Sequence, residues 1–385
     1  MTVSRPPSGM SPRHHSDKCR DYGGPFQCPI RGTGKLRVTQ WTPPNNADVA
    51  TQTIDLTAAQ LTDQFSRPIT YLRISVTDKC NLRCVYCMPE AGLPWLPKSE
   101  ILSYEEIVKI VAAAAEVGVR SVRLTGGEPL VRRDLASLIE QIRALGIEDI
   151  ALSTNALLLS DQIDDLVRAG LRRVNISLDT LRPDRFFSIA RRPGLDKVMA
   201  GIHAAIAAGL HPVKVNCVVM RGQNDDELED FARMTIDQPI FVRFIEVMPV
   251  HENTALQAAT YMSADEMLAQ IATIDDLQPV AGPSGNGPAR YFAFPRAHGA
   301  IGVISPLSHD YCERCNRVRL TADGRLRMCL FGDQHVDLRN PLRAGASRNE
   351  LIGLLQSAMT IKPERHHLRL GEPAARMRAF SEIGG

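Results

Sequence analysis

Residues 71–90 read YLRISVTDKCNLRCVYCMPE, and this stretch decides the fold. Its first part alternates, with Ile74 and Val76 apolar and Arg73 and Ser75 polar. Such alternation predicts a strand that packs one face on an apolar layer and turns the other toward polar surroundings. A loop with three closely spaced cysteines follows the strand directly.

The same pattern recurs along the chain. Further β-rich runs are expected at 120–125, 149–154, 172–178, 213–219 and 241–247, with helical stretches between most of them. Six strands alternating with helices predict a parallel sheet. A doubly wound sheet has apolar strands because both of its faces are buried, whereas these strands alternate. We therefore expect an α/β fold, an incomplete (β/α)6 TIM-like barrel with a polar, partly cationic interior.

Capping signals mark the ends of the helices. A Ser followed three residues later by Glu is a capping box, and it predicts helix starts at Ser103, Ser263 and Ser347. Asp134 is expected to open another helix. The pattern changes after about residue 250, which predicts three parts: a disordered N-terminal extension at 1–60, the barrel at 61–250 and a smaller C-terminal domain at 251–385.

Composition limits the classes of function. The chain has 385 residues and a formal net charge of +2, so bulk charge indicates no nucleic-acid partner. No apolar run approaches the ~20 residues of a membrane span, and residues 1–40 contain no secretory signal. We expect a cytoplasmic protein, with an organellar matrix as the less favoured location. Of nine cysteines, Cys217 is expected in the core, Cys19 and Cys28 are unassigned, and the other six form two groups.

The first group is Cys80, Cys84 and Cys87, spaced C-x-x-x-C-x-x-C. A structural zinc loop usually has two C-x-x-C pairs or a nearby fourth ligand, and neither is present. Three thiolates leave a 4Fe–4S cluster with one open iron, which can take S-adenosylmethionine (SAM). The spacing is typical of radical SAM enzymes. It is supported by aromatic Tyr86 and by Gly126-Gly127-Glu128-Pro129, which resembles the GGEP segment that holds the SAM amino group.

The second group is Cys312, Cys315 and Cys329. Spacing alone leaves two alternatives, a zinc site completed by His309 or His335 and a second cluster with a free iron. Arg317 and Arg319 alternate on an expected strand and would project to the same side. They are either a cationic fork for a phosphorylated substrate or part of a solvated strand face.

With both groups in view, the chain resembles the molybdenum-cofactor biosynthesis protein A family, the GTP 3′,8-cyclases of the radical SAM superfamily. The resemblance runs from about Leu61 to the last residue. It is carried by LTDQFSRPITYLRISVTDKCNLRCVYCMPE, VRLTGGEPLVRRDL, VNISLDTL, VRFIEVMP, IGVISPLSHDYCERCNRVRLTADGRLRMCLF and the terminal IGG. It implies a partial barrel closed by a C-terminal domain with a second 4Fe–4S cluster. It also implies that a 5′-deoxyadenosyl radical removes the ribose C3′ hydrogen of GTP, after which C3′ joins C8.

The resemblance also assigns roles to residues. It implies that the two cysteine groups hold two 4Fe–4S clusters and that Gly384 and Gly385 reach the active site with Arg317 and Arg319. Positions matching SAM contacts are Tyr86, Gly126, Gly127, Glu128, Ser177 and Met248. Positions matching GTP contacts are Arg73, Arg123, Thr154, Lys214, Arg317, Val318 and Arg319. The alternative for Arg73, Arg123 and Lys214 is an internal salt bridge to Asp179 or Glu246. The alternative for the terminal glycines is a frayed C-terminus.

Partners follow from the same resemblance: GTP as substrate, a reductant such as flavodoxin or ferredoxin, a downstream pyranopterin-forming enzyme and a second copy of the chain in a homodimer. Three features depart from the family pattern: Ser121 in place of a common Lys, the segment 251–255 and Phe380. Two other functions are considered, a peptide-modifying radical SAM enzyme with an auxiliary cluster and a non-enzymatic zinc- or cluster-binding scaffold.

Overall fold

The computed structural model describes residues 60–248, 254–283, 287–370, 372 and 380–383. The extension predicted at 1–60, with Cys19 and Cys28, lies almost wholly outside the described residues, as do Gly384 and Gly385 and most of the segment 251–255. In the described part of the chain, no helix is long and apolar enough to cross a membrane.

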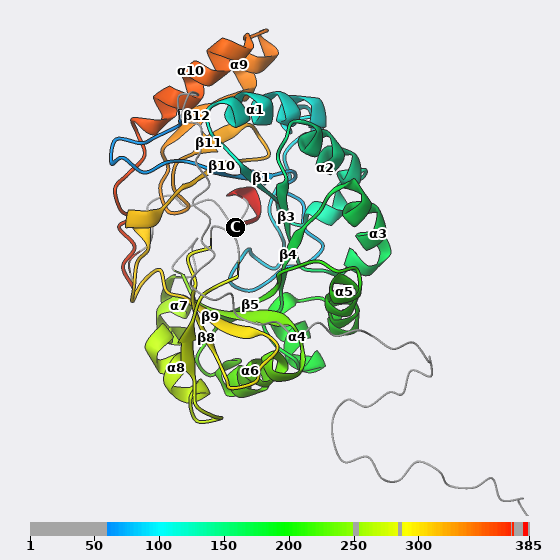
Figure 1. Cartoon of the computed structure of the whole chain (residues 1–385), viewed down its shortest axis with the longest axis vertical. Coiled ribbons are helices and arrows are strands. Elements are labelled where there is room, and N and C mark those ends of the chain that lie inside the picture. Colours follow the sequence, from blue (N-terminus) through cyan, green and yellow to red (C-terminus); the bar gives the residue numbers. More distant parts are fainter. Residues whose placement is uncertain (1–59, 249–253, 284–286, 371, 373–379, 384–385) are drawn as a thin grey trace, which may run out of the picture. The chain divides into compact units, whose positions relative to one another are not determined.

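Six parallel strands form the centre of the fold, as predicted. They are β1 (Tyr71–Ser75), β2 (Ser121–Thr125), β3 (Asp149–Thr154), β4 (Arg173–Ser177), β5 (Val213–Val219) and β6 (Ile240–Glu246). Each pairs in parallel with the next, in the order of the sequence. Helices lie outside these strands (Figure 1). They are α1 (Tyr104–Glu116), α2 (Leu135–Ala144), α3 (Leu159–Ala169), α4 (Pro183–Ala190), α5 (Leu195–Ala207) and α6 (Leu228–Asp237).

The C-terminal segment extends this sheet at both edges, which the sequence did not predict. Strand β10 (Arg317–Leu320) pairs in parallel with β1, and β9 (Ala300–Ile304) pairs in parallel with β6. Antiparallel strands then continue each edge, so the described residues form one 12-stranded sheet. The added strands are β7 (Gln278–Val280), β8 (Arg290–Ala293), β11 (Arg325–Arg327) and β12 (His335–Asp337). The C-terminal residues therefore border the barrel interior directly.

The remaining helices belong to this C-terminal segment: α7 (Thr254–Thr260), α8 (Ala264–Ile271), α9 (Arg339–Arg343), α10 (Arg348–Met359) and α11 (Phe380–Ile383). Single 3-10 turns are η1 (Lys98–Glu100), η2 (Pro129–Val131), η3 (Asp225–Glu227) and η4 (Cys312–Arg314). The capping boxes predicted at Ser103, Ser263 and Ser347 are all present. Asp134 precedes α2 as expected, but it has a left-handed φ of 59° and its side chain makes no capping bond.

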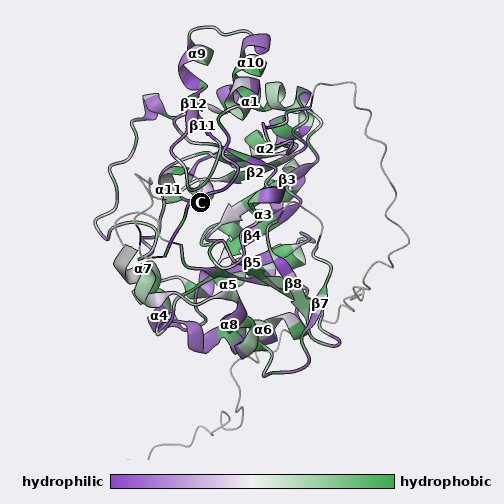
Figure 2. Ribbon diagram, turned by 90° about the vertical axis from the view of Figure 1, so that its left-hand side faces the viewer, coloured by the Kyte–Doolittle hydropathy of each residue, from purple (hydrophilic) through white to green (hydrophobic). Residues whose placement is uncertain are grey.

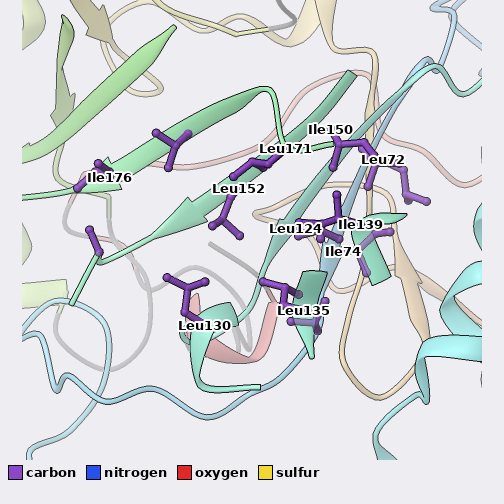
Figure 3. Close-up of a cluster of buried hydrophobic side chains, with 14 of the residues drawn as sticks. Leu72, Ile74, Leu124, Leu130, Leu135, Ile139, Ile150, Leu152, Leu171 and Ile176 are labelled. Atoms are coloured by element: carbon purple, nitrogen blue, oxygen red, sulfur yellow. The ribbon is translucent and has the colours of Figure 1, made fainter. Parts of the chain in front are cut away.

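The apolar side of the strands packs against the helices. Ile74, Leu124, Leu152 and Ile176 are fully buried and belong to one hydrophobic cluster with Leu135 and Ile139 of α2 (Figure 3). The strands carry both hydrophobic and hydrophilic residues (Figure 2), in keeping with the predicted alternation. The hydrophobic effect thus fixes the register of each strand, because a slip by one residue would turn the polar set into the helical layer.

Candidate active site

One cavity collects the polar faces of all six central strands. Its lining includes Arg73 from β1, Arg123 from β2, Asn175 and Ser177 from β4, and Lys214 from β5. Residues from the C-terminal segment complete it, among them Phe380. Its helix α11, red in Figure 1, lies inside the ring of strands. The alternation read from the sequence therefore corresponds to a real interior surface.

The first cysteine group lies in the loop after β1, and all three thiols line the cavity. The loop is closed by a hydrogen bond from the Cys87 N–H to the Cys84 carbonyl at 2.9 Å. Burial raises the pKa of Cys80 to about 11, and burial with nearby Asp179 and Cys87 raises that of Cys84 well above its usual range. Crowded, buried thiols fit the ligand set of an iron centre, whose positive charge stabilises thiolates.

The Gly-Gly pair after β2 packs directly on this loop. A Cβ added at Gly126 would lie 2.5 Å from the Thr77 carbonyl oxygen, and one at Gly127 would overlap the carbonyl oxygens of Asp78 and Lys79. The Gly127 N–H donates to the Thr77 carbonyl and the Glu128 N–H to the Lys79 carbonyl, both at 2.8 Å. The glycines are therefore needed for the loop to approach the sheet, in addition to lining the cavity.

Glu128 contributes differently from what its motif suggests. Its buried carboxylate accepts hydrogen bonds from Thr154 Oγ1 and the Asn155 N–H, both at 2.7 Å, and from the Leu130 N–H at 3.0 Å. Burial raises its pKa to about 7. Asn155 in turn lies 3.9 Å from the Cys80 sulfur. Glu128 does not line the cavity, whereas Thr154 and Asn155 do. The Glu128 carboxylate therefore acts on the site through these two residues.

Tyr86 is anchored by a carboxylate that the sequence did not assign to the site. Its hydroxyl donates to Asp179 Oδ2 at 2.7 Å, and the Val218 N–H donates to Asp179 Oδ1 at 2.9 Å. Burial raises the pKa of Asp179 to about 6. Both Tyr86 and Asp179 line the cavity. A partly buried hydrogen bond between the segment after β4 and the cysteine loop thus fixes the aromatic ring beside the thiols.

Seven basic side chains line the cavity within the described residues: Arg73, Arg123, Arg173, Lys214, Arg243, Arg317 and Arg319. Burial, then Arg319, lowers the pKa of Arg73, and burial, then Arg317, lowers that of Arg319 to about 10. Mutual repulsion of this kind is relieved by an anionic ligand.

Asp179 and Glu246 were considered as salt-bridge partners of Arg73, Arg123 and Lys214, but the contacts that these two carboxylates make are different. Asp179 accepts from Tyr86 and Val218. Glu246 accepts from the N–H groups of Ala264, Leu307 and Ser308 at 3.0, 2.9 and 3.1 Å. Both carboxylates are thus engaged by neutral donors.

The fork predicted at Arg317 and Arg319 is present. Strand β10 places Arg317 opposite Tyr71 and Arg319 opposite Arg73, and both guanidinium groups line the cavity. Val318 between them is 2% exposed, belongs to the hydrophobic core and is not among the cavity-lining residues. Arg319 is buried and Arg317 is half-buried, so the solvated-face alternative is wrong.

The second cysteine group lies beside this fork. Cys312 begins η4 and Cys315 follows it. The three cysteines are not themselves among the cavity-lining residues, although the neighbouring Tyr311 and Leu330 are. The histidines considered as zinc ligands are engaged elsewhere. His309 Nε2 lies 2.9 Å from Asp265 Oδ2, and His335 Nδ1 lies 2.8 Å from the Asp333 carbonyl.

Other predicted residues also reach the cavity, and some lining residues were missed. Thr154, Ser177 and Met248 line it. Arg173, Arg243 and Tyr71 were not predicted, although Arg243 occupies a polar position in a strand that was recognised. Ser121 donates to Asp149 Oδ2 at 2.7 Å, and Asp149 pairs with Arg173. The Ser121 hydroxyl therefore holds the carboxylate of the Asp149–Arg173 ion pair at the start of the strands.

Most of the described chain matches two known family models. Residues 74–235 match the model of the Radical SAM superfamily, and residues 240–368 match that of Molybdenum Cofactor Synthesis C. GTP 3′,8-cyclase of Heliobacterium modesticaldum is 51% identical over 325 residues, covering 84% of this chain and 99% of the relative. The corresponding enzyme of Pelotomaculum thermopropionicum is 49% identical over 325 residues, with the same coverage.

A solved structure supports the fold alone. SuiB of Streptococcus suis, in a crystal structure with S-adenosylmethionine, is 15% identical, with a TM-score of 0.50 over 75% of this chain and 71% of that one.

Proposed function

The chain belongs to the GTP 3′,8-cyclase family of the radical SAM superfamily, and we propose that it converts GTP to (8S)-3′,8-cyclo-7,8-dihydroguanosine 5′-triphosphate. This is the first step of molybdenum cofactor biosynthesis. The observation that supports it most directly is that one cavity is lined both by Cys80, Cys84 and Cys87 and by seven basic side chains. Radical initiation and an anionic substrate are thereby accommodated in one interior.

The charge of the cavity suits a nucleoside triphosphate. GTP carries roughly four negative charges at neutral pH, so several converging cations are needed to desolvate it. Arg73, Arg123 and Lys214 line the cavity from β1, β2 and β5, and Arg317 and Arg319 line it from β10, which pairs with β1. One guanidinium group can bind two phosphate oxygens at once. We therefore assign these basic side chains to the triphosphate and base of GTP, with the Thr154 hydroxyl beside them.

The cysteine loop suits a SAM-binding 4Fe–4S cluster. Cys80, Cys84 and Cys87 would hold it, while Tyr86, Gly126, Gly127, Ser177 and Met248, which line the same cavity, would hold SAM. When bound, this pair supplies one-electron chemistry that starts radical reactions at carbon. Glu128 and Asp179 would keep Asn155 and Tyr86 in position. Burial of the site would exclude water from reactive species.

We further propose a second 4Fe–4S cluster on Cys312, Cys315 and Cys329. The engaged His309 and His335 argue for it over a Cys3His zinc site. This proposal divides the chain into a radical SAM part at 61–250 and an auxiliary-cluster and substrate-binding part at 251–385. The tail role of Gly384 and Gly385, a flavodoxin or ferredoxin reductant, a pyranopterin-forming enzyme downstream, a homodimer and a cytoplasmic location remain parts of the proposal.

Anaerobic turnover tests the proposed function. Protein reconstituted with iron and sulfide is incubated with SAM, dithionite and GTP, and nucleosides are followed by mass spectrometry. We expect 5′-deoxyadenosine whose formation depends on GTP, together with a cyclised product of GTP. SAM cleavage that leaves GTP unchanged would contradict the proposal and favour a peptide-modifying enzyme.

A further inference from the structure

A buried lysine touches the second cysteine group. Lys362 follows α10 and is 2% exposed. Its ammonium donates to the Cys315 sulfur at 3.4 Å, the Arg317 carbonyl at 3.0 Å and the Met328 carbonyl at 2.9 Å. An ammonium has three donors, and all three are used here. Each acceptor belongs to the loop and strands that carry the cysteines.

The backbone around Lys362 is held in place by residues far away in the sequence. Arg67 donates to the carbonyls of Pro363 and Glu364, both at 2.7 Å, and to the Cys312 carbonyl at 2.8 Å. A buried salt bridge of 2.7 Å joins Arg67 to Asp63. Residues 363 and 364 and the Cys312 loop are therefore fixed against one common guanidinium, and the Lys362 carbonyl accepts from Gln64 at 3.1 Å, so Lys362 has little freedom to point elsewhere.

A buried cation aimed at sulfur has a specific electrostatic consequence. Burying an ammonium is costly unless anionic or strongly polar groups surround it. The two backbone carbonyls would be satisfied by a neutral donor, so they do not explain why the buried donor is a lysine. The contact with Cys315 does, because a thiolate there would balance the charge of Lys362. Lys362 therefore sets a positive charge against the Cys315 sulfur, where a bound cluster would carry negative charge.

We propose that Lys362 is a positioning residue of the second iron–sulfur cluster, which fixes the Cys315 ligand and stabilises the reduced cluster by its hydrogen bond and charge. This inference rests on the proposed second cluster. Reduction adds negative charge to a cluster, and hydrogen bonds to its sulfurs favour that state. Loss of the Lys362 charge should therefore make the cluster harder to reduce.

A purely structural role is the alternative. In that case Lys362 would only cross-link the carbonyls of Arg317 and Met328, and its loss would lower stability without changing the electrochemistry. The reduction potential of the second cluster separates the two roles, because a structural cross-link does not act on it.

The experiment uses the full chain with Cys80, Cys84 and Cys87 changed to Ser, so that EPR reports only the second cluster. Lys362→Met removes charge and donor while keeping the length of the side chain. Lys362→Gln keeps a neutral donor for the carbonyls. Arg365→Met is the matched control, because Arg365 pairs with Asp310 at 3.1 Å on the same loop but is 47% exposed. Iron and sulfide content, circular dichroism and the EPR-monitored redox midpoint are measured.

We expect the parent chain and the control to share one midpoint. In Lys362→Met the reduced-to-oxidised ratio at a given potential should fall at least tenfold, equivalent to about 59 mV for a one-electron couple. Lys362→Gln should lie between them. A cluster-loaded Met or Gln variant with the parent midpoint would overturn the inference. A parent chain that binds no iron at Cys312, Cys315 and Cys329 would instead refute the proposed second cluster.

A measurement without substitution covers variants that fail to assemble. The chain is prepared with ¹⁵N-labelled lysine, its second cluster is reduced without GTP, and pulsed EPR is used to detect nitrogen coupling. A lysine ¹⁵N coupling is expected from the Lys362 contact with Cys315. Its absence from the loaded, reduced parent would refute the inference irrespective of how the variants fold.

Discussion

Lys214 should take up a proton when GTP binds. It is 3% exposed, and burial, followed by Arg243, Arg123 and Arg173, lowers its pKa to about 6 from an ordinary 10.5. At pH 8 only about 1% of Lys214 would be charged in the free protein. A bound triphosphate supplies the negative charge that stabilises the ammonium, and this raises the pKa toward its ordinary value.

The size of the effect follows by linkage. Between pH 6 and the pKa in the complex, uptake approaches one proton, so GTP affinity should fall about tenfold per pH unit, or about 1.4 kcal/mol. Because protein with Lys214 protonated binds GTP better than protein with Lys214 neutral, the affinity for GTP should fall as the pH rises. The γ-phosphate, with a second pKa of about 6, is fully ionised at pH 8 and contributes little.

Isothermal titration calorimetry provides the assay. GTP is titrated anaerobically at pH 8 in buffers with different ionisation enthalpies. The slope of the observed binding enthalpy against the ionisation enthalpy of the buffer gives the number of protons taken up. Lys214→Met serves as the matched variant, because it cannot titrate and should lose both the uptake and the pH slope. No uptake by the parent chain, or equal uptake by both proteins, would refute the reasoning.

Two further predictions concern the cofactor side of the cavity. Gly127→Ala would overlap the carbonyl oxygens of Asp78 and Lys79, so iron at the first cysteine group should be lost. Gly353→Ala in α10, where an added Cβ meets nothing within 4 Å, should keep full iron content; equal contents in the two variants would contradict this. Tyr86→Phe removes the donor to Asp179, so SAM should bind roughly three- to tenfold more weakly, about 0.5–1.5 kcal/mol. Equilibrium dialysis measures this, and an unchanged dissociation constant would show that the hydroxyl does not position the ring.

The local pattern was sufficient to predict the barrel strands and the capped helices. Strand β5 was predicted at 213–219 and runs from Val213 to Val219, because period-two alternation reports directly on a half-polar interior. The helix starts at Ser103 and Ser347 were likewise found, since a capping box involves only neighbouring residues.

Contacts between distant residues could not be predicted in this way. The pairing of Tyr71 with Arg317 brings the second cysteine group beside the first strand, and no local signal encodes it. Glu128 was predicted at the site and Asp179 only as a salt-bridge partner, but the donors that engage their carboxylates come from the turn after β3 and from β5. Arg243 was missed because the alternation of its strand was not used, although its register with Asn216 puts both on the cavity side.

Turnover of GTP deuterated at C3′ tests the central claim most directly. The reconstituted chain is incubated anaerobically with SAM and dithionite, and the 5′-deoxyadenosine and nucleotide products are analysed by mass spectrometry. We predict one deuterium in 5′-deoxyadenosine and a cyclised product that has lost it. Deuterium that remains in unaltered GTP while SAM is cleaved would contradict the assignment of this cavity to GTP cyclisation.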